Sequence, residues 1–324
     1  MKSEIGSEFW DVPVGPLNSL FPENTQWFIS GRSALSAILA ENSFKTAALP
    51  RWCCESMVKP FTDAKIKVSY YNRDENPPAA DAVLVLDYFG YTNDRTFHSY
   101  NGAVIRDLSH SLLSKPKEDA DYYFGSLRKW AGFWTGGFAR GFKKEIHWQT
   151  NNTDFIVLRH KAMEQKKEYL EGRRDDKTYL RIFAAAEACL ESIRITPAAE
   201  RDVELARHLD VEEIKSRRRQ NALVLFSAFH EECIFPMFKK TDCPLFVPIM
   251  VPQRDSLRSH LIQNDIYCPI HWPLFDSQAA DKKMQKLHDE ELSLVCDQRY
   301  QKADMNRIIK VIQNFYHGEH ILPC

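Results

Sequence analysis

The 324-residue sequence lacks several patterns that would each point to a particular class of protein. Its eight cysteines form no Cys-x-x-Cys pair, so the short ligand spacing of a structural zinc site is missing and no metal site is expected. No apolar run approaches the roughly 20 residues that a membrane-spanning helix needs, and residues 1–6 contain no apolar signal segment. These absences predict a cytoplasmic protein with no membrane partner.

The sequence also has no excess of charge of either sign. The 43 Lys and Arg residues nearly balance the 44 Asp and Glu residues, and the net charge is −1. This balance argues against a nucleic-acid partner, because nucleic-acid-binding proteins usually show a basic excess. Apolar residues make up 44% of the chain, enough for a large buried core, and the length suggests about two domains.

Short apolar runs alternate with helical patterns over the first two thirds of the chain, as they do in βα units. Strands are predicted at 27–30, 47–49, 66–70, 83–86, 103–105 and 122–125, and a helix is predicted to start near Ser33. Later segments predict helices at 179–192, 211–229, 255–263 and 303–316, with strands at 245–251 and 266–268. We therefore expect a large α/β domain over 15–200 and a smaller α+β domain over 201–324, with residues 1–14 packed on the smaller one.

Candidate site residues follow the predicted strands, because ligands bind at the carboxyl ends of strands in open α/β sheets. The strand at 27–30 leads into Gly31, Arg32 and Ser33 at a helix start, which suits a phosphate; a plain strand–helix junction capped by Ser33 explains the same residues. Trp52 follows the next strand, where it is either a core residue or a plate for a planar ligand.

Two later strands deliver a carboxylate and an amine. Asp107 follows the strand at 103–105, and a buried Asp is expected to hold a cation. Lys129 follows the strand at 122–125 in a Ser-x-x-Lys segment, where a lowered pKa would make it a Schiff-base former, although a lone lysine is usually solvated. Phosphate turn, aromatic plate, Asp and Lys in this order fit pyridoxal 5'-phosphate, which needs a lysine, an anion at its ring nitrogen and donors for its phosphate.

Five segments of the chain resemble the motifs of one family. They are 30–35 (Ser-Gly-Arg-Ser-Ala-Leu), 107–110 (Asp-Leu-Ser-His), 126–129 (Ser-Leu-Arg-Lys) ahead of glycines 136 and 137, 269–273 (Pro-Ile-His-Trp-Pro), and 293–300 (Ser-Leu-Val-Cys-Asp-Gln-Arg-Tyr). Together they resemble the DegT/StrS family of nucleotide-sugar aminotransferases. The resemblance implies the type I pyridoxal-phosphate fold, which has a large mostly parallel sheet domain with helices on both faces and a smaller C-terminal α+β domain.

The resemblance also implies an activity and a set of site residues. It implies a homodimer that transfers an amino group from glutamate to a nucleotide-linked keto-deoxy sugar. Lys129 would form the Schiff base and Asp107 would meet the pyridine nitrogen, so both would be catalytic. The implied cofactor contacts are Gly31, Arg32 and Ser33 at the phosphate, Trp52 against the ring, His110 near the ring hydroxyl, and Ser126 at the phosphate. His271 would belong to the substrate loop.

The sequence departs from the family pattern in places, and this keeps other functions open. The lysine segment reads Ser-Leu-Arg-Lys instead of Phe-His-x-x-Lys, and the Asn-x-Arg that the partner subunit normally supplies has a counterpart only at 179–181 (Tyr-Leu-Arg). Lys129 argues against the related dehydratases, in which a histidine replaces it. The alternatives are a pyridoxal-phosphate enzyme acting on an amino acid or other small carbonyl compound, and a cofactor-free binding or regulatory protein.

The sequence also bears on the arginines at 217–219 and on Asp87, whose places in the fold it does not decide. The arginines at 217–219 are expected on a solvated face, since consecutive helical residues face different directions. Asp87 ends a predicted strand on the same side as Asp107, where it either lines the site or simply terminates the strand.

Overall fold

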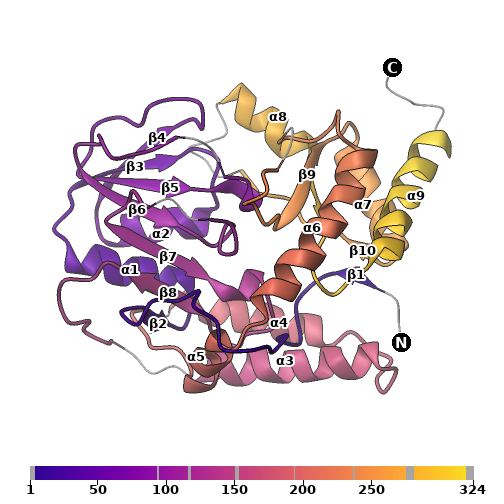
Figure 1. Ribbon diagram of the computed structural model, residues 1–324, viewed down its shortest axis with the longest axis horizontal. Helices are drawn as coiled ribbons and strands as arrows, with labels where there is room; N and C mark the ends of the chain where they lie inside the picture. Colours follow the sequence, from indigo (N-terminus) through magenta and orange to yellow (C-terminus); the bar gives the residue numbers. More distant parts are fainter. Residues whose placement is uncertain are drawn as a thin grey trace.

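A seven-stranded sheet lies at the centre of the larger part of the molecule (Figure 1). The computed structural model describes residues 4–92, 95–115, 118–149, 153–192, 194–235, 238–274 and 281–318. The strands occur in the order β2-β8-β7-β6-β5-β3-β4. Their bounds are β2 (Gln26–Phe28), β3 (Thr46–Pro50), β4 (Lys67–Tyr71), β5 (Ala82–Leu86), β6 (Ala103–Asp107), β7 (Tyr122–Ser126) and β8 (Gly137–Arg140). Strands β4, β3, β5, β6 and β7 run parallel, and β8 runs antiparallel to both of its neighbours.

The parallel strands are buried and apolar, as parallel strands usually are. All five residues of β5 are buried, and their sequence is Ala-Val-Leu-Val-Leu. The register pairs Leu86 of β5 with Asp107 of β6, and Asp107 with Phe124 of β7. The carboxyl ends of these neighbouring strands therefore meet at one edge, which brings Asp107 close to the segment that follows β7.

The helices of the first half begin directly after strands. Helix α1 (Gly31–Glu41) follows β2 and packs on β7 and β8, and α2 (Glu55–Asp63) follows β3. The Ser30 side chain caps α1 by accepting a hydrogen bond from the Ser33 backbone N–H at 3.2 Å. The helix thus starts two residues before the predicted position, and its cap is Ser30 rather than Ser33.

The remaining helices pack below the sheet and beside it (Figure 1). Helices α3 (Asp154–Leu170) and α4 (Tyr179–Cys189) pack on each other, followed by α5 (Glu200–Arg207) and α6 (Val211–Ala228). The C-terminal part contains β9 (Phe246–Met250), α7 (Arg254–Gln263), β10 (Ile266–Tyr267), α8 (Lys282–Glu290), β11 (Glu291–Val295) and α9 (Lys302–Gly318). Strand β11 pairs antiparallel with β9.

The beginning of the chain lies against its C-terminal part. Strand β1 (Ile5–Gly6) pairs in parallel with β10, and the Tyr300 hydroxyl accepts a hydrogen bond from the Gly6 N–H at 2.8 Å. The division at residues 200 and 201 stays a prediction. In the part of the chain that the structure describes, no helix is long and apolar enough to cross a bilayer.

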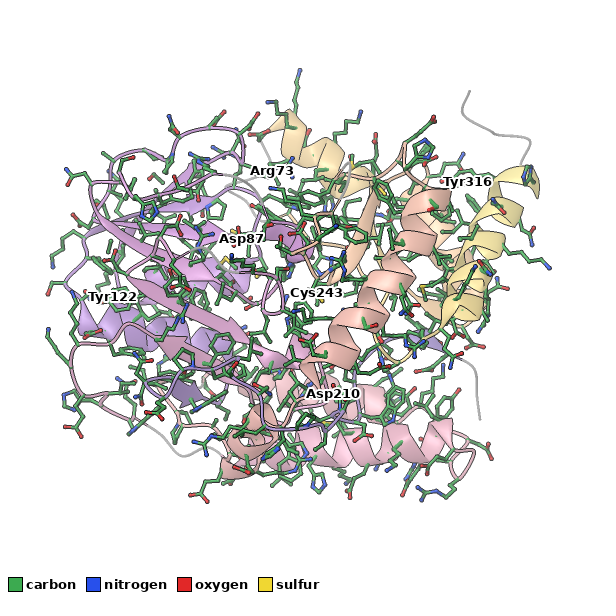
Figure 2. All side chains as sticks on the ribbon, in the orientation of Figure 1. Arg73, Asp87, Tyr122, Asp210, Cys243 and Tyr316 are labelled. Carbon is green, nitrogen blue, oxygen red and sulfur yellow. The ribbon has the colours of Figure 1, made fainter. Side chains whose placement is uncertain are left out.

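A buried ion-pair cluster joins β5 and β6 beneath the strand ends. Arg106, which has no exposed surface, donates from Nη1 to Asp87 at 2.9 Å and from Nη2 to Asp119 at 2.6 Å. Asp87 thus belongs to an interior ion pair at the end of β5 (Figure 2). This answers the question that the sequence left open, since Asp87 does not line either of the cavities described below.

Candidate active site

Asp107 is the last residue of β6, and its side chain is almost completely buried. One carboxylate oxygen accepts a hydrogen bond from the Ser109 backbone N–H at 2.7 Å. Burial raises the pKa of Asp107, while the hydrogen bonds from Ser109 and the positive charge of Lys129 oppose that rise. A buried carboxylate in this setting needs a cationic partner.

Lys129 lies in the short 3-10 turn Leu127–Lys129 that follows β7, so the strand end places it beside Asp107. Its Nζ is 2.9 Å from Nε2 of His110. Burial lowers the pKa of Lys129, and the charges of Cys54 and Asp107 partly oppose that effect. Burial, together with Lys129, also holds the pKa of His110 well below its usual value. The lowered pKa of Lys129 favours the neutral amine, which is the nucleophilic form of lysine.

The hydrogen bonds of His110 agree with a neutral lysine. Its Nδ1 accepts from the Phe89 backbone N–H at 3.4 Å, which places the ring proton on Nε2. That proton can then be donated to the lone pair of the Lys129 amine. His110 therefore holds Lys129 in place through a contact that only the uncharged amine can accept.

Asp107 and Lys129 line the same cavity, which has a volume of about 220 Å³. The start of α1 and the ends of β6 and β7 contribute to the lining of this first cavity. Six of the residues predicted from the sequence line it: Gly31, Arg32, Asp107, His110, Ser126 and Lys129.

A larger second cavity of about 550 Å³ adjoins the first. Both cavities are lined by Arg128, Lys129 and Glu187, so Lys129 lies at their junction. His271, predicted from the sequence as a substrate-loop residue, lines the second cavity.

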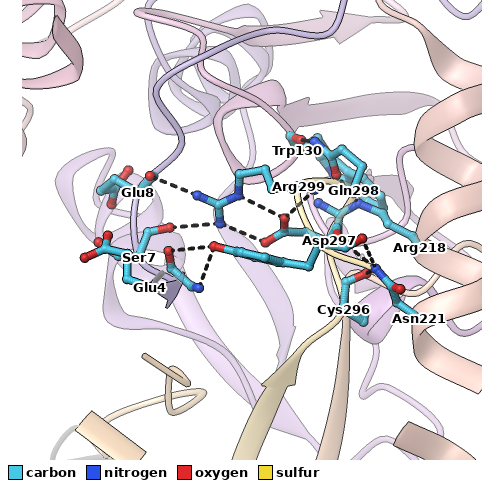
Figure 3. Close-up of polar contacts among 12 residues, drawn as sticks. Glu4, Ser7, Glu8, Trp130, Arg218, Asn221, Cys296, Asp297, Gln298 and Arg299 are labelled. Atoms are coloured by element: carbon cyan, nitrogen blue, oxygen red, sulfur yellow. Dashed lines mark hydrogen bonds and ion pairs between the residues drawn. The ribbon is translucent and has the colours of Figure 1, made fainter. Parts of the chain in front are cut away.

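Residues from both ends of the chain form one wall of the second cavity (Figure 3). Arg299 donates to the backbone carbonyls of Ser7 and Glu8 at 3.2 and 3.1 Å, and its guanidinium also pairs with Asp297. These contacts fix the N-terminal segment against the loop after β11.

Two of the predicted residues, Trp52 and Ser33, line neither of these two cavities in the described part of the chain. Trp52 stacks on Tyr88 with ring centroids 4.7 Å apart, and its indole N–H donates to the His271 carbonyl at 2.9 Å. The hydroxyl of Ser33 donates to the Arg194 carbonyl at 2.8 Å and accepts from the Thr196 N–H at 2.9 Å. Packing and backbone hydrogen bonds therefore engage both side chains. A different tryptophan, Trp272, lines the cavity.

The sequence interpretation missed other lining residues, among them Cys54, Arg128 and Arg218. Cys54 and Arg128 line the first cavity; Cys54 lies two positions after Trp52, and Arg128 directly precedes Lys129. Arg218 lines the second cavity and is only 1% exposed, so the expectation of a solvated arginine run was wrong at this position. Its guanidinium lies 4.7 Å from the centre of the Trp130 ring and donates to Gln298 at 2.8 Å. Tertiary packing of α6 turns this one arginine inward.

Arg128 carries an unsatisfied donor in the described structure. It forms an ion pair with Glu187, but its buried Nε has no hydrogen-bond partner there. Burial and the nearby Arg159 lower the pKa of Arg128 to about 10. A buried guanidinium with a spare N–H is a suitable contact for an anion.

The residues of the first cavity fit pyridoxal phosphate. Ser30 accepts a hydrogen bond from the Ser33 N–H, but the first-turn N–H groups of Gly31 and Arg32 have no acceptor within the helix. The helix start is also positively polarised, so it suits a phosphate. A Cβ on Gly31 would lie only 3.2 Å from the Gly125 carbonyl oxygen. Glycine at this position therefore lets the start of α1 lie close to β7. A protonated ring nitrogen would supply the cation that buried Asp107 needs.

Comparison with known proteins identifies the fold. No family model matches the sequence, and no curated protein matches it. Among solved structures, a DegT/DnrJ/EryC1/StrS aminotransferase from Brucella abortus aligns with a TM-score of 0.60 and 13% identity over 90% of this chain and 85% of that one. The aminotransferase TlmJ from Streptoalloteichus hindustanus gives 0.63 and 14% over 92% and 87%. The fold is thus that of the sugar aminotransferases, as the sequence resemblance implied.

The same fold is also found in an enzyme with a different reaction. A GDP-4-keto-6-deoxymannose-3-dehydratase with a trapped PLP–glutamate geminal diamine aligns with a TM-score of 0.59 and 11% identity over 89% of this chain and 88% of that one. The fold therefore does not choose between the two reactions, and the choice depends on the residues of the site.

Proposed function

We propose that this protein is a pyridoxal-phosphate-dependent aminotransferase that moves an amino group from glutamate to a keto-deoxy sugar linked to a nucleotide diphosphate. The observation that carries the proposal is the shared cavity, in which Asp107, Lys129 and the start of α1 stand around a volume of about 220 Å³. The reactive lysine favours amino transfer over the dehydratase reaction, in whose enzymes a histidine takes that place.

Each residue of the first cavity has a defined task in this proposal. The start of α1, Ser126 and the spare N–H of Arg128 hold the phosphate. Asp107 keeps the ring nitrogen protonated by its opposite charge. When bound, the cofactor supplies an electron sink that makes the Cα–H bond of the amino donor acidic. Lys129, as a neutral amine, accepts that proton and returns it.

The second cavity is the proposed place of the sugar nucleotide. Its volume of about 550 Å³ exceeds that of the first cavity, and Lys129 contributes to the lining of both. The arginines at 128, 218, 258 and 299 contribute to its lining, which suits a diphosphate. We also propose that the protein is a cytoplasmic homodimer, and sedimentation of the purified protein tests its oligomeric state.

The function is tested by following the two half-reactions separately. Purified protein loaded with pyridoxal phosphate should be yellow, and glutamate should convert its visible spectrum to that of the pyridoxamine form. A nucleotide-linked keto sugar should then restore the original spectrum. Rapid reaction with several amino acids but with no keto sugar would instead favour an enzyme for small carbonyl substrates. Failure to bind pyridoxal phosphate would overturn the proposal.

Replacing Asp107 with asparagine should slow the glutamate half-reaction by a factor on the order of 10³. The asparagine amide can still accept the hydrogen bond from Ser109, but it has no charge to keep the ring nitrogen protonated. Stopped-flow absorbance measures the rate, and cofactor titration shows whether binding survives. A half-reaction as fast as in the unmodified protein would show that Asp107 does not act on the cofactor.

A further inference from the structure

Three buried groups form a continuous hydrogen-bonded chain at the wall of the second cavity. Nδ1 of His271 is 2.9 Å from the hydroxyl of Ser293, and that hydroxyl donates to Oε1 of Glu291 at 2.6 Å. Ser293 and Glu291 have no exposed surface, and His271 is 8% exposed. The two β11 residues are separated by two positions and so lie on one face of the strand, facing His271.

The second oxygen of Glu291 has a different task. It accepts a hydrogen bond from the His271 backbone N–H at 2.7 Å, which fixes the loop to the strand. Arg254 on α7 donates to the Glu291 backbone carbonyl at 2.8 Å, and its Nε pairs with Asp255. Within the described residues, no ion pair reaches the Glu291 carboxylate. Anchoring the loop needs only the hydrogen bond from the His271 backbone to Glu291. It does not require the second connection, which runs from the His271 ring through Ser293 to Glu291.

The cavity end of this chain is a neutral imidazole beside Lys129. Burial and the charge of Lys129 hold the pKa of His271 well below its usual value, so the imidazolium form is disfavoured. The His110 ring lies 5.5 Å away, and the rings of Phe89 and Phe246 each lie 5.1 Å away. Nε2 of His271 has no hydrogen-bond partner among the residues that the structure describes. An imidazole in this setting can exchange a proton only if it loses another at the same time.

We propose that His271, Ser293 and Glu291 form a proton relay that gives a proton to, and takes one from, an oxygen of the substrate in the second cavity. This proposal rests on the proposed function. When Nε2 of His271 accepts a proton, Nδ1 passes its own proton to the Ser293 oxygen, and the Ser293 proton moves to Glu291. The imidazole stays neutral, and the carboxylate becomes a carboxylic acid. The reverse sequence returns the proton.

The relay has a chemical use in amino transfer to a ketone. The carbonyl oxygen of the acceptor leaves as water, so it must gain two protons while the amino group takes its place. His271 in the form that carries the proton on Nε2 can donate one of them. Burial raises the pKa of Glu291 to about 7, although the hydrogen bonds from His271 and Ser293 and the charge of Arg254 oppose it. The protonated and the ionised forms of Glu291 are therefore both populated near neutral pH.

Nitrogen NMR of the cofactor-loaded protein with isotope-labelled histidine tests the relay without turnover. The signal of His271 is assigned by its loss in His271→Asn. As pH falls through about 7, the ring proton should move from Nδ1 to Nε2 while the imidazole remains neutral. The Glu291→Gln and Ser293→Ala variants should each keep one tautomer at every pH, and Ser293→Thr should restore the movement. The matched control is Ser227→Ala, which removes an exposed hydroxyl outside both cavities.

The possible results of these experiments distinguish failure of the relay from failure of the proposed function. Conversion of His271 to imidazolium, or an unchanged tautomer across neutral pH in the folded protein, would overturn the relay even if amino transfer is observed. Movement of the proton in a protein that does not react with glutamate would overturn the proposed function and leave the coupling of the three residues standing. In the active enzyme, Ser293→Ala should lower kcat with the keto substrate by a factor on the order of 10².

Discussion

Replacing Lys129 with alanine should abolish amino transfer, with a loss on the order of 10⁴-fold or more. The substitution removes the amine that we propose binds the cofactor covalently and carries the proton. His110 and Asp107 would remain in the cavity, but neither is an amine that can form a Schiff base. Borohydride reduction followed by peptide mass analysis should find the cofactor attached to Lys129 in the unmodified protein and to no peptide in the variant.

The matched control is Lys59→Ala, which removes an exposed lysine paired with Asp63 on α2. This variant should retain the colour, the covalent attachment and the rate of the glutamate half-reaction. Cofactor attached to a different lysine in the Lys129→Ala protein would show that the reactive amine has been assigned to the wrong residue.

Replacing Arg106 with methionine should destabilise the protein by about 3–5 kcal/mol. Methionine fills much of the volume, but it leaves the buried carboxylates of Asp87 and Asp119 facing each other without their cation. Urea unfolding followed by circular dichroism measures the change in free energy. Adding Asp87→Asn and Asp119→Asn to the variant should recover part of the lost stability, because these changes remove the unpaired charges.

The same substitution at an exposed ion pair provides the comparison. Arg173 pairs with Glu171 on the surface, so Arg173→Met should leave the unfolding midpoint almost unchanged. Equal effects at the two positions would show that the Arg106 cluster contributes no more than a surface pair.

The sequence predicts the strands well where apolar runs end at polar residues. The six strands predicted in the first half are all present; Asp107 is the last residue of one of them, β6, and Lys129 follows another, β7. Strand β8 was not predicted, because Gly-Phe-Ala-Arg contains no β-branched residue and begins at a glycine. It is stabilised by antiparallel pairing with both β7 and β2, which is a property of the assembled sheet.

The residues that the sequence misplaced depend on contacts between distant segments. Trp52 had two possible roles, and the stacking on Tyr88 that decides its position involves a residue 36 positions away. Arg218 belongs to a run of three arginines, and only the packing of α6 on Trp130 shows which of them is buried. The segment 293–300 was singled out from the sequence, but nothing there links Ser293 or Glu291 to His271, since the histidine meets them only when the loop at 269–273 folds against β11.

The wall that Arg299 and Tyr300 form with residues 6–8 has a consequence for biosynthesis. The ribosome adds residues 6–8 long before it adds Arg299 and Tyr300, which anchor them. Asp107 and Lys129 therefore leave the exit tunnel long before the second cavity has all of its sides. A nascent chain can gather the groups of the first cavity early, but the second cavity gains this wall only after Arg299 has been added.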